Sequence, residues 1–198
     1  MRRRVLPQTR RCINVFCPRR RVARLALVTY ITTGGSLCAS VVLAIPRNQL
    51  PTPAGAWLIS PMSSSTPLAS TTTNAKTDDF AGWDDAALFV KLHQLIANTG
   101  SATEIPITHP DVAPAFGDYT GVCPLFISAV ATEALRDDAI AIAKAARRAG
   151  VSVKVSIARH GLHTMPIFGA RVVEGAEETA LAARWLAERL HPGFGDYE

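Results

Sequence analysis

Short apolar runs alternate with amphipathic stretches along most of the chain, and this alternation constrains the fold more than any other feature. The expected strands lie near residues 25–30, 55–60, 124–130 and 151–157. Stretches with helical spacing follow them, such as 137–149 and 174–190. Repeats of strand and helix are typical of a parallel sheet. We therefore predict an α/β fold with a parallel, doubly wound sheet, strands adjacent in chain order and helices on both faces.

The segment from Leu25 to Ile45 carries no charge and follows an arginine-rich stretch, which on length alone matches a membrane-spanning helix. Its centre, residues 29–36, combines β-branched residues, hydroxyls and paired glycines. This composition favours a strand, a tight turn and a helix instead. We predict the latter, and a membrane anchor formed by 25–45 remains the alternative.

The domain boundaries are predicted from composition and charge. The chain has 198 residues, of which 48% are hydrophobic and 19% charged, so one domain can bury a substantial core. Nine arginines fall within residues 2–24. Such a run can bind nucleic acid or anionic lipid but is more often a solvated tail. We expect a disordered tail at 1–23, a domain at 24–191, a short tail at 192–198 and no nucleic-acid partner.

The cysteines and histidines give no sign of a metal site. The four cysteines form no C-x-x-C pair and do not cluster with histidine. His160 and His163 are three residues apart, but no third ligand has a recognisable spacing from them. We expect no metal and no cofactor, and free thiols in a reducing, cytoplasmic compartment.

Polar residues that could do chemistry follow three of the expected strands. Active sites of open α/β sheets collect at the carboxyl ends of strands. There the sequence has 32–35 after the first strand, 132–138 after the third and 160–163 after the fourth. A hydroxyl, an acid and a histidine in this chain order match the arrangement nucleophile, acid, base. From spacing alone this pattern is weak.

A series of motifs makes this pattern of hydroxyl, acid and histidine more specific. Residues 29–37, T-Y-I-T-T-G-G-S-L, resemble an elbow G-D-S-A-G-G-N-L; 58–61, L-I-S-P, is similar to L-x-S-P; and 109–114 is similar to P-x-x-S-P. Residues 121–127 resemble G-L-P-P-L-L-I, 131–138 an E-x-L-x-D-D acid loop, and 161–163 a closing histidine motif. Together, over about residues 24–190, they resemble the C-terminal half of an α/β-hydrolase of the hormone-sensitive-lipase-like esterase family.

The resemblance implies the role of each site residue. Thr32 falls on the position of the nucleophilic serine, Glu133 on the acid and His163 on the base. The amide of Thr33 falls on an oxyanion donor. The implied substrate is a small-molecule carboxylic ester. Asp137 and Asp138 are better explained as first-turn charges of a helix, and His160 as solvent-facing.

The sequence also departs from the family pattern. Threonine replaces the nucleophilic serine, and Tyr30 replaces a glycine of the elbow. The strained turn of an elbow costs on the order of 1–3 kcal/mol, and a β-branched residue tolerates it worse than serine. No H-G-G-G oxyanion loop occurs in the chain. We expect a truncated esterase that is weakly active or inactive, and the alternative is a non-enzymatic degenerate hydrolase or a membrane-anchored binding protein.

Three further expectations concern packing. The first strand has an unpartnered apolar edge if the chain is truncated, which predicts poor solubility or a homo-oligomer. Residues 62–77 are rich in serine, threonine and proline and predict a surface connection. The apolar stripe of the last helix is expected to contain Ala176, Ala180, Leu181, Trp185 and Leu186.

Overall fold

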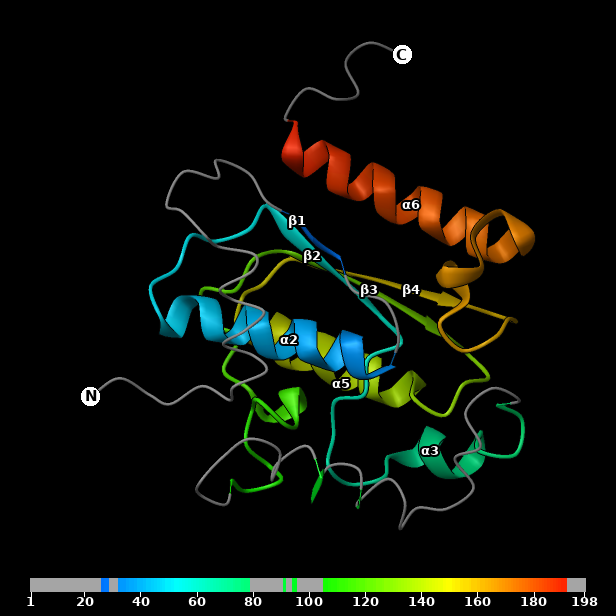
Figure 1. Ribbon diagram of the computed structural model, residues 1–198, viewed down its shortest axis with the longest axis horizontal. Coiled ribbons are helices and arrows are strands. Elements are labelled where there is room, and N and C mark those ends of the chain that lie inside the picture. The colour runs from blue at the N-terminus through cyan, green and yellow to red at the C-terminus, as the bar shows by residue number, and fades with distance from the viewer. Residues whose placement is uncertain (1–25, 29–31, 79–90, 92–93, 96–104, 192–198) are drawn as a thin grey trace.

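The computed structural model describes residues 26–28, 32–78, 91, 94–95 and 105–191, and it contains a parallel sheet (Figure 1). The strands are β1 (Ala26–Val28), β2 (Gly55–Ile59), β3 (Leu125–Val130) and β4 (Val153–Ala158). Their order in the sheet is β1-β2-β3-β4, and every pairing is parallel. The register sets Ile59 opposite Ser128 and Ser128 opposite Ser156. The predicted strand order is confirmed.

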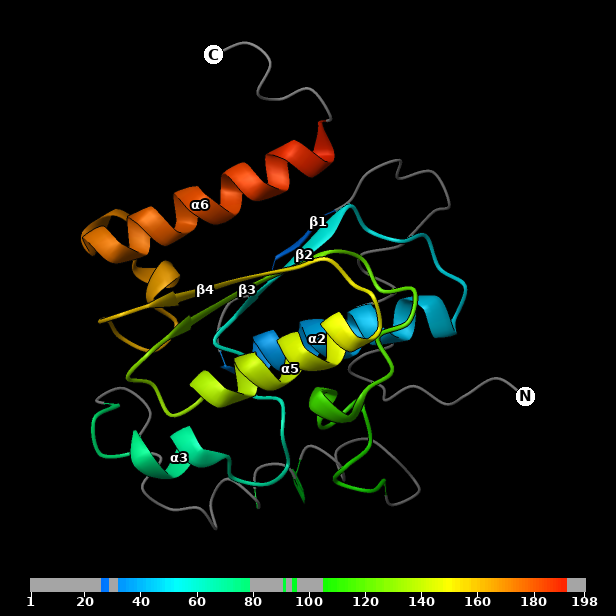
Figure 2. The ribbon, with the colours of Figure 1, turned by 180° about the vertical axis from the view of Figure 1, so that it is seen from behind.

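Helices cover both faces of this sheet. α2 (Thr32–Arg47) and α5 (Arg136–Arg148) lie on one face, and α6 (Val173–Leu190) lies on the other, as Figures 1 and 2 show from opposite sides. A short helix, α3 (Ala69–Thr73), and the 3-10 segments η1 (Pro114–Phe116) and η2 (Met165–Arg171) complete the described elements. The doubly wound α/β architecture predicted from the sequence is therefore confirmed.

Helix α5 illustrates how the local sequence specifies an element. Asp137 and Asp138 lie in its first turn and Arg147 and Arg148 in its last turn, so both ends complement the helix dipole. Gly150 follows with a φ of 80°, a left-handed conformation that favours glycine. Its N–H donates to the carbonyl of Arg147 at 3.0 Å and ends the helix.

The uncharged segment 25–45 divides into two elements. Residues 26–28 form β1 and pair with β2, and α2 begins at Thr32. In the part of the chain that the structure describes, no helix is long and apolar enough to cross a membrane. The basic tail 1–23 and the C-terminal tail 192–198 lie outside the described residues. Most of residues 84–98, where the sequence also has helical spacing, lie outside them as well.

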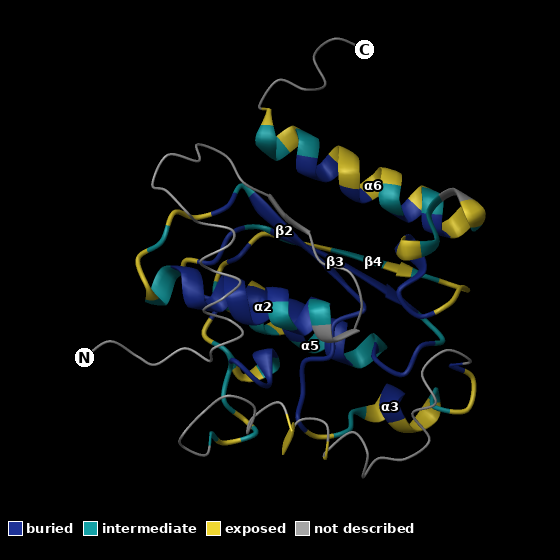
Figure 3. Ribbon diagram, in the orientation of Figure 1, coloured by how far each residue is buried: buried dark blue, intermediate teal, exposed yellow. Residues whose placement is uncertain are grey.

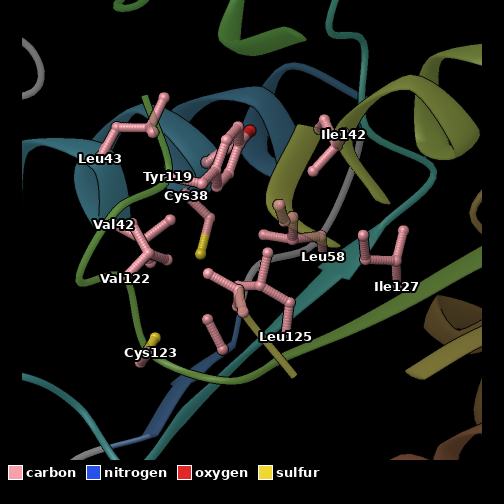
Figure 4. Packing of buried hydrophobic residues seen from close by; sticks show 14 of the residues in the cluster. Cys38, Val42, Leu43, Leu58, Tyr119, Val122, Cys123, Leu125, Ile127 and Ile142 are labelled. Carbon is pink, nitrogen blue, oxygen red and sulfur yellow. The ribbon is translucent and has the colours of Figure 1, made fainter. Parts of the chain in front are cut away.

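The main core lies between the sheet and the face covered by α2 and α5. β2 and β3 are buried along their whole length (Figure 3). Figure 4 shows Cys38 and Val42 of α2 pointing toward Leu58 and Leu125 of the sheet, with Ile142 of α5 beside them. Burying one such aliphatic side chain contributes about 1.5–3 kcal/mol. This apolar layer holds α2, whose first residue is Thr32, against the sheet.

The serine-rich segment 62–77 is only in part the surface connection that its composition predicted, since most of residues 66–77 are exposed or half-buried but residues 62–65 are not. Residues 61–65 are buried, and α3 follows them. The backbone N–H groups of Ser63 and Ser64 donate to Asp138 Oδ1 at 2.7 and 2.8 Å, and the Ser63 hydroxyl donates to the carbonyl of Asp138. Because a buried carboxylate satisfies these polar groups, the segment can enter the interior.

The buried stripe of α6 also differs from the prediction. Trp185 and Leu186 are buried as expected, but Leu181 is 38% exposed and Ala182 is buried in its place. Glu178 is buried in the middle of the stripe. Its carboxylate accepts hydrogen bonds from Ser128 on β3 and Ser156 on β4, so an acid occupies a position that apolar periodicity would assign to a hydrophobic residue.

Candidate active site

A buried acid and histidine meet after the carboxyl ends of β3 and β4. Glu133 lies in the loop between β3 and α5, and His163 lies in the loop between β4 and η2. The His163 Nδ1 is 2.8 Å from the Glu133 Oε2, and the two side chains are 2% and 1% exposed. Their positions in the chain are 30 residues apart. The fold thus brings together two of the residues that the motifs singled out.

The contact with an ionised Glu133 carboxylate selects one tautomer of a neutral His163. An ionised carboxylate only accepts hydrogen bonds, so the Nδ1 that contacts Glu133 is the donor. In a neutral imidazole the other nitrogen, Nε2, then has the lone pair. A histidine held in this tautomer can remove a proton from a hydroxyl at Nε2 while the carboxylate stabilises the resulting charge.

Glu133 is fixed by the end of its own strand. Its Oε1 accepts the backbone N–H of Val130 at 3.1 Å, and its own N–H donates to the Val130 carbonyl at 3.2 Å. One carboxylate oxygen therefore faces the strand and the other faces His163. Buried polar groups need such partners, and here both oxygens have one.

The segment after β2 supports the acid loop from outside, and sequence reasoning missed this role. The Asn74 side chain donates to the carbonyls of Ala131 and Glu133, both at 3.0 Å. The Asp78 carboxylate accepts the N–H of Ala134 at 2.8 Å, and the Ser70 hydroxyl donates to the Ala134 carbonyl at 2.8 Å. The turn-forming residues of this segment gave no sign of it, because each contact depends on a loop about 60 positions away.

Thr32 and Thr33 are the first two residues of α2, which starts just beyond the carboxyl end of β1. The first backbone N–H groups of an α-helix have no partner within the helix and favour negative charge. Gly35 allows this helix end to approach β2 closely, since a Cβ there would lie 2.9 Å from the Ile59 carbonyl oxygen. Parallel topology sets the start of α2 at the same sheet edge as the loops that follow β3 and β4 (Figure 1).

The neighbouring aspartates point elsewhere. Asp138 is fully buried against Ser63 and Ser64, and burial raises its pKa to about 6. Partial burial raises the pKa of Asp137, but hydrogen bonds from the Arg136 guanidinium and the Ser70 N–H outweigh that effect and lower it. Asp137 therefore behaves as the expected first-turn charge, whereas Asp138 is a buried acceptor that attaches the segment 63–64 to α5.

His160 does not join the pair. It is exposed and lines a cavity of about 340 Å³ together with Arg159, Glu174 and Glu178, beside the end of β4 and α6. Neither Glu133 nor His163 lines this cavity. Among the described residues no group of three or more histidine, cysteine, aspartate or glutamate side chains could hold a metal ion.

Comparison with known proteins gives a consistent result. The model of a family described as alpha/beta hydrolase fold matches residues 31–167. An acetyl-hydrolase of Streptomyces hygroscopicus is 28% identical over 163 residues, which are 82% of this chain and 52% of that protein. The chain thus spans about half the length of this curated relative.

Solved structures share the fold. An esterase/lipase from an uncultured bacterium has a TM-score of 0.70 at 26% identity, covering 84% of this chain and 53% of that one. A hormone-sensitive lipase from a metagenome library has a TM-score of 0.70 at 24% identity, covering 83% of this chain and 53% of that one. At that identity the second likeness concerns the fold alone.

Proposed function

Because this chain belongs to the alpha/beta hydrolase fold family, we propose that it carries the nucleophile, acid and base positions of a carboxylic-ester hydrolase. The observation that carries the proposal is the buried contact of 2.8 Å between His163 Nδ1 and Glu133 Oε2. The similar acetyl-hydrolase and esterase/lipase support the substrate class, a small-molecule ester.

In the proposed reaction Thr32 is the nucleophile. Its Oγ1 attacks the carbonyl carbon of the ester while His163 Nε2 takes the hydroxyl proton, which gives a tetrahedral oxyanion and an imidazolium. The imidazolium then protonates the departing alcohol and leaves an acyl group on Thr32. A water molecule, deprotonated in turn by Nε2, attacks the acyl carbonyl and releases the acid. Glu133 holds the Nδ1–H throughout and stabilises the positive ring.

Oxyanion stabilisation is the weaker part of the site. The Thr33 N–H lies at the start of α2 and has no intrahelical partner, which suits an oxyanion donor. The 198 residues contain no H-G-G-G segment to supply further donors. Each missing donor removes about 3–4 kcal/mol of transition-state stabilisation in the best-studied case. We therefore propose that this chain alone hydrolyses esters weakly or not at all.

A second candidate function is the binding of an ester-like ligand without turnover. The observation that favours it is the elbow itself, where Thr32 and Tyr30 replace the serine and a glycine of the family pattern. In the family pattern this turn is strained, and a β-branched or bulky residue is tolerated there worse than serine or glycine. Binding of a ligand does not require a nucleophile, whereas turnover does.

The test uses the full 198-residue chain and separates chemistry from binding. A fluorophosphonate, whose phosphorus is attacked as an ester carbonyl would be, should label the Thr32→Ser variant at residue 32, and the added change His163→Ala should abolish that label. On short p-nitrophenyl esters, turnover by the unmodified chain should not exceed that of His163→Ala, with slight recovery in Thr32→Ser. Labelling that does not depend on His163 would contradict the proposed roles. Robust hydrolysis abolished by Thr32→Ala would instead establish threonine as an efficient nucleophile.

A further inference from the structure

Two buried residues with left-handed backbones contact each other beside His163. Within the described part of the chain, the non-glycine residues with positive φ are Gln49, Ser60 and Thr164. Ser60 has a φ of 42° and Thr164 a φ of 55°, and both are almost fully buried. The Thr164 N–H donates to the Ser60 hydroxyl at 3.2 Å, across 104 positions of the sequence. Such conformations cost free energy and tend to gather at functional sites.

This contact fixes the peptide group that follows His163. The carbonyl oxygen of that peptide accepts the Thr164 hydroxyl at 2.7 Å, and its N–H donates to Ser60. Both polar ends of the peptide plane are therefore held. Because the plane includes the His163 Cα, its orientation restricts the direction in which the His163 side chain leaves the backbone.

Ser60 is itself fixed by the sheet. It directly follows β2, and its N–H donates to the carbonyl of Ser128 on β3 at 2.8 Å. Glu133 is tied to the same strand, β3, through the Val130 N–H. Ser60 follows β2 and holds the peptide group after His163, whereas Val130 on β3 holds Glu133. The pairing of β2 with β3 thus fixes these two points relative to each other.

We propose that Ser60 is a positioning residue for His163: its hydroxyl accepts the Thr164 N–H and thereby holds the imidazole in line with Glu133. The inference rests on the proposed function, in which His163 is the base. Ser60 acts on His163 indirectly. Its effect passes through the main chain of Thr164.

The experiment measures the His163 Nδ1 proton by NMR in the full chain with ¹⁵N-labelled histidine. The variants are Ser60→Ala and Ser60→Gly, with Glu133→Gln as the reference in which the acceptor of that proton is gone. Ser65→Ala is the matched control, since Ser65 is buried in the next turn of chain and its hydroxyl has no partner among the described residues. The Thr164 amide is followed by hydrogen exchange in the same samples.

Both Ser60 variants should lose protection of the Thr164 amide by about tenfold, which corresponds to one hydrogen bond of about 1.4 kcal/mol. They should also lose or broaden the Nδ1 proton signal, as Glu133→Gln does, while Ser65→Ala retains it. Glycine relieves the positive φ that alanine does not, so Ser60→Gly should unfold at higher urea than Ser60→Ala and still lose the signal. If Ser60→Ala does not fold, Ser60→Gly alone decides.

A purely structural role predicts the opposite outcome for glycine. Retention of the Nδ1 signal in Ser60→Gly would overturn the proposal, because the backbone and not the hydroxyl would then be what matters. The signal does not depend on ester turnover. Loss of the signal together with failed labelling of residue 32 would leave Ser60 as a positioning residue and reject the hydrolase roles. An unchanged signal together with His163-dependent labelling would reject the positioning role of Ser60 and support the hydrolase roles.

Discussion

Ser128 on β3 donates its hydroxyl to the carboxylate of Glu178 on α6, with 2.6 Å between the oxygens, on the face of the sheet opposite α2 and α5. The same Ser128 hydroxyl accepts the indole N–H of Trp57 at 2.7 Å, and the second Glu178 oxygen accepts the Ser156 hydroxyl at 2.7 Å. Three strands and one helix are therefore joined through one buried acid.

We expect Glu178→Ala to lower the free energy of unfolding by at least about 2 kcal/mol, because it leaves two hydroxyl donors without their acceptor, at about 1–3 kcal/mol for each unsatisfied buried group. Urea denaturation would measure the change. The matched control is Glu177→Ala, the adjacent and exposed residue of the same helix, which should shift stability by less than about 0.5 kcal/mol. Equal effects of the two substitutions would contradict this account.

The adjacent glycines of α2 should respond oppositely to alanine. A Cβ at Gly35 would lie 2.9 Å from the Ile59 carbonyl oxygen and from Pro61 Cα, whereas a Cβ at Gly34 would meet no described residue within 4 Å. We expect Gly35→Ala to destabilise the fold by about 1–3 kcal/mol through overpacking against backbone. Gly34→Ala should be neutral or stabilise by up to about 1 kcal/mol, since alanine is the better helix former. Thermal melts of both variants would check the contrast.

The strand order and the doubly wound architecture could be predicted from sequence because they depend on local patterns. Apolar runs such as 125–130 indicate buried strands, and the charges and Gly150 delimit α5. Glu178 could not be recognised as buried, because its partners are serines on two other elements. The apolar pattern predicts these two strands but does not indicate that Ser128 and Ser156 contact Glu178. The burial of residues 62–65 could not be predicted for the same reason: the backbone N–H groups of Ser63 and Ser64 are satisfied by Asp138, a residue 74 to 75 positions away.

The candidate site was predictable only in part. The motifs singled out Glu133 and His163, and the structure brings these side chains into contact. The catalytic roles of Thr32, Thr33, Glu133 and His163 remain predictions, as does the expected homo-oligomer. Asn74, Asp78 and Ser60 act on main-chain atoms of distant loops, so no pattern in their own neighbourhood distinguishes them from ordinary turn residues.

The buried Asp138 should make stability depend on pH. Burial raises its pKa from 3.8 to about 6, so the folded chain holds this proton more tightly than the unfolded chain. The free energy of unfolding should therefore fall as the pH rises from about 4 through 6, by up to roughly 3 kcal/mol for a shift of about two pH units. We expect Asp138→Asn to remove this component. Urea titrations of both proteins at pH 4 and 7.5 would measure this component. Between these pH values the free energy of unfolding should fall more for the unmodified chain than for Asp138→Asn.

Removing Asn74 should loosen the acid loop without unfolding the domain. Asn74→Ala deletes two hydrogen bonds to the carbonyls of Ala131 and Glu133, each worth about 0.5–1.5 kcal/mol. We expect faster amide hydrogen exchange across residues 131–137, measured by mass spectrometry. Thr72→Ala, an exposed change in α3 two residues before Asn74, serves as the control and should leave exchange across residues 131–137 unaltered. Local protection that survives in Asn74→Ala would show that the loop is held by its own contacts.

The acid loop is supported by hydrogen bonds that involve its peptide groups. The partners are Asn74, Asp78 and the Ser70 hydroxyl, and the peptide groups are those of Ala131, Glu133 and Ala134. Peptide groups are the same whatever side chains they carry. A change of side chain at position 132 or 133 therefore leaves these supporting hydrogen bonds available, whereas shortening the acid at 133 removes only its own contacts with the Val130 N–H and His163. For protein engineering, side chains within residues 131–134 could be redesigned while the segment 69–78, which makes the supporting hydrogen bonds, is kept unchanged.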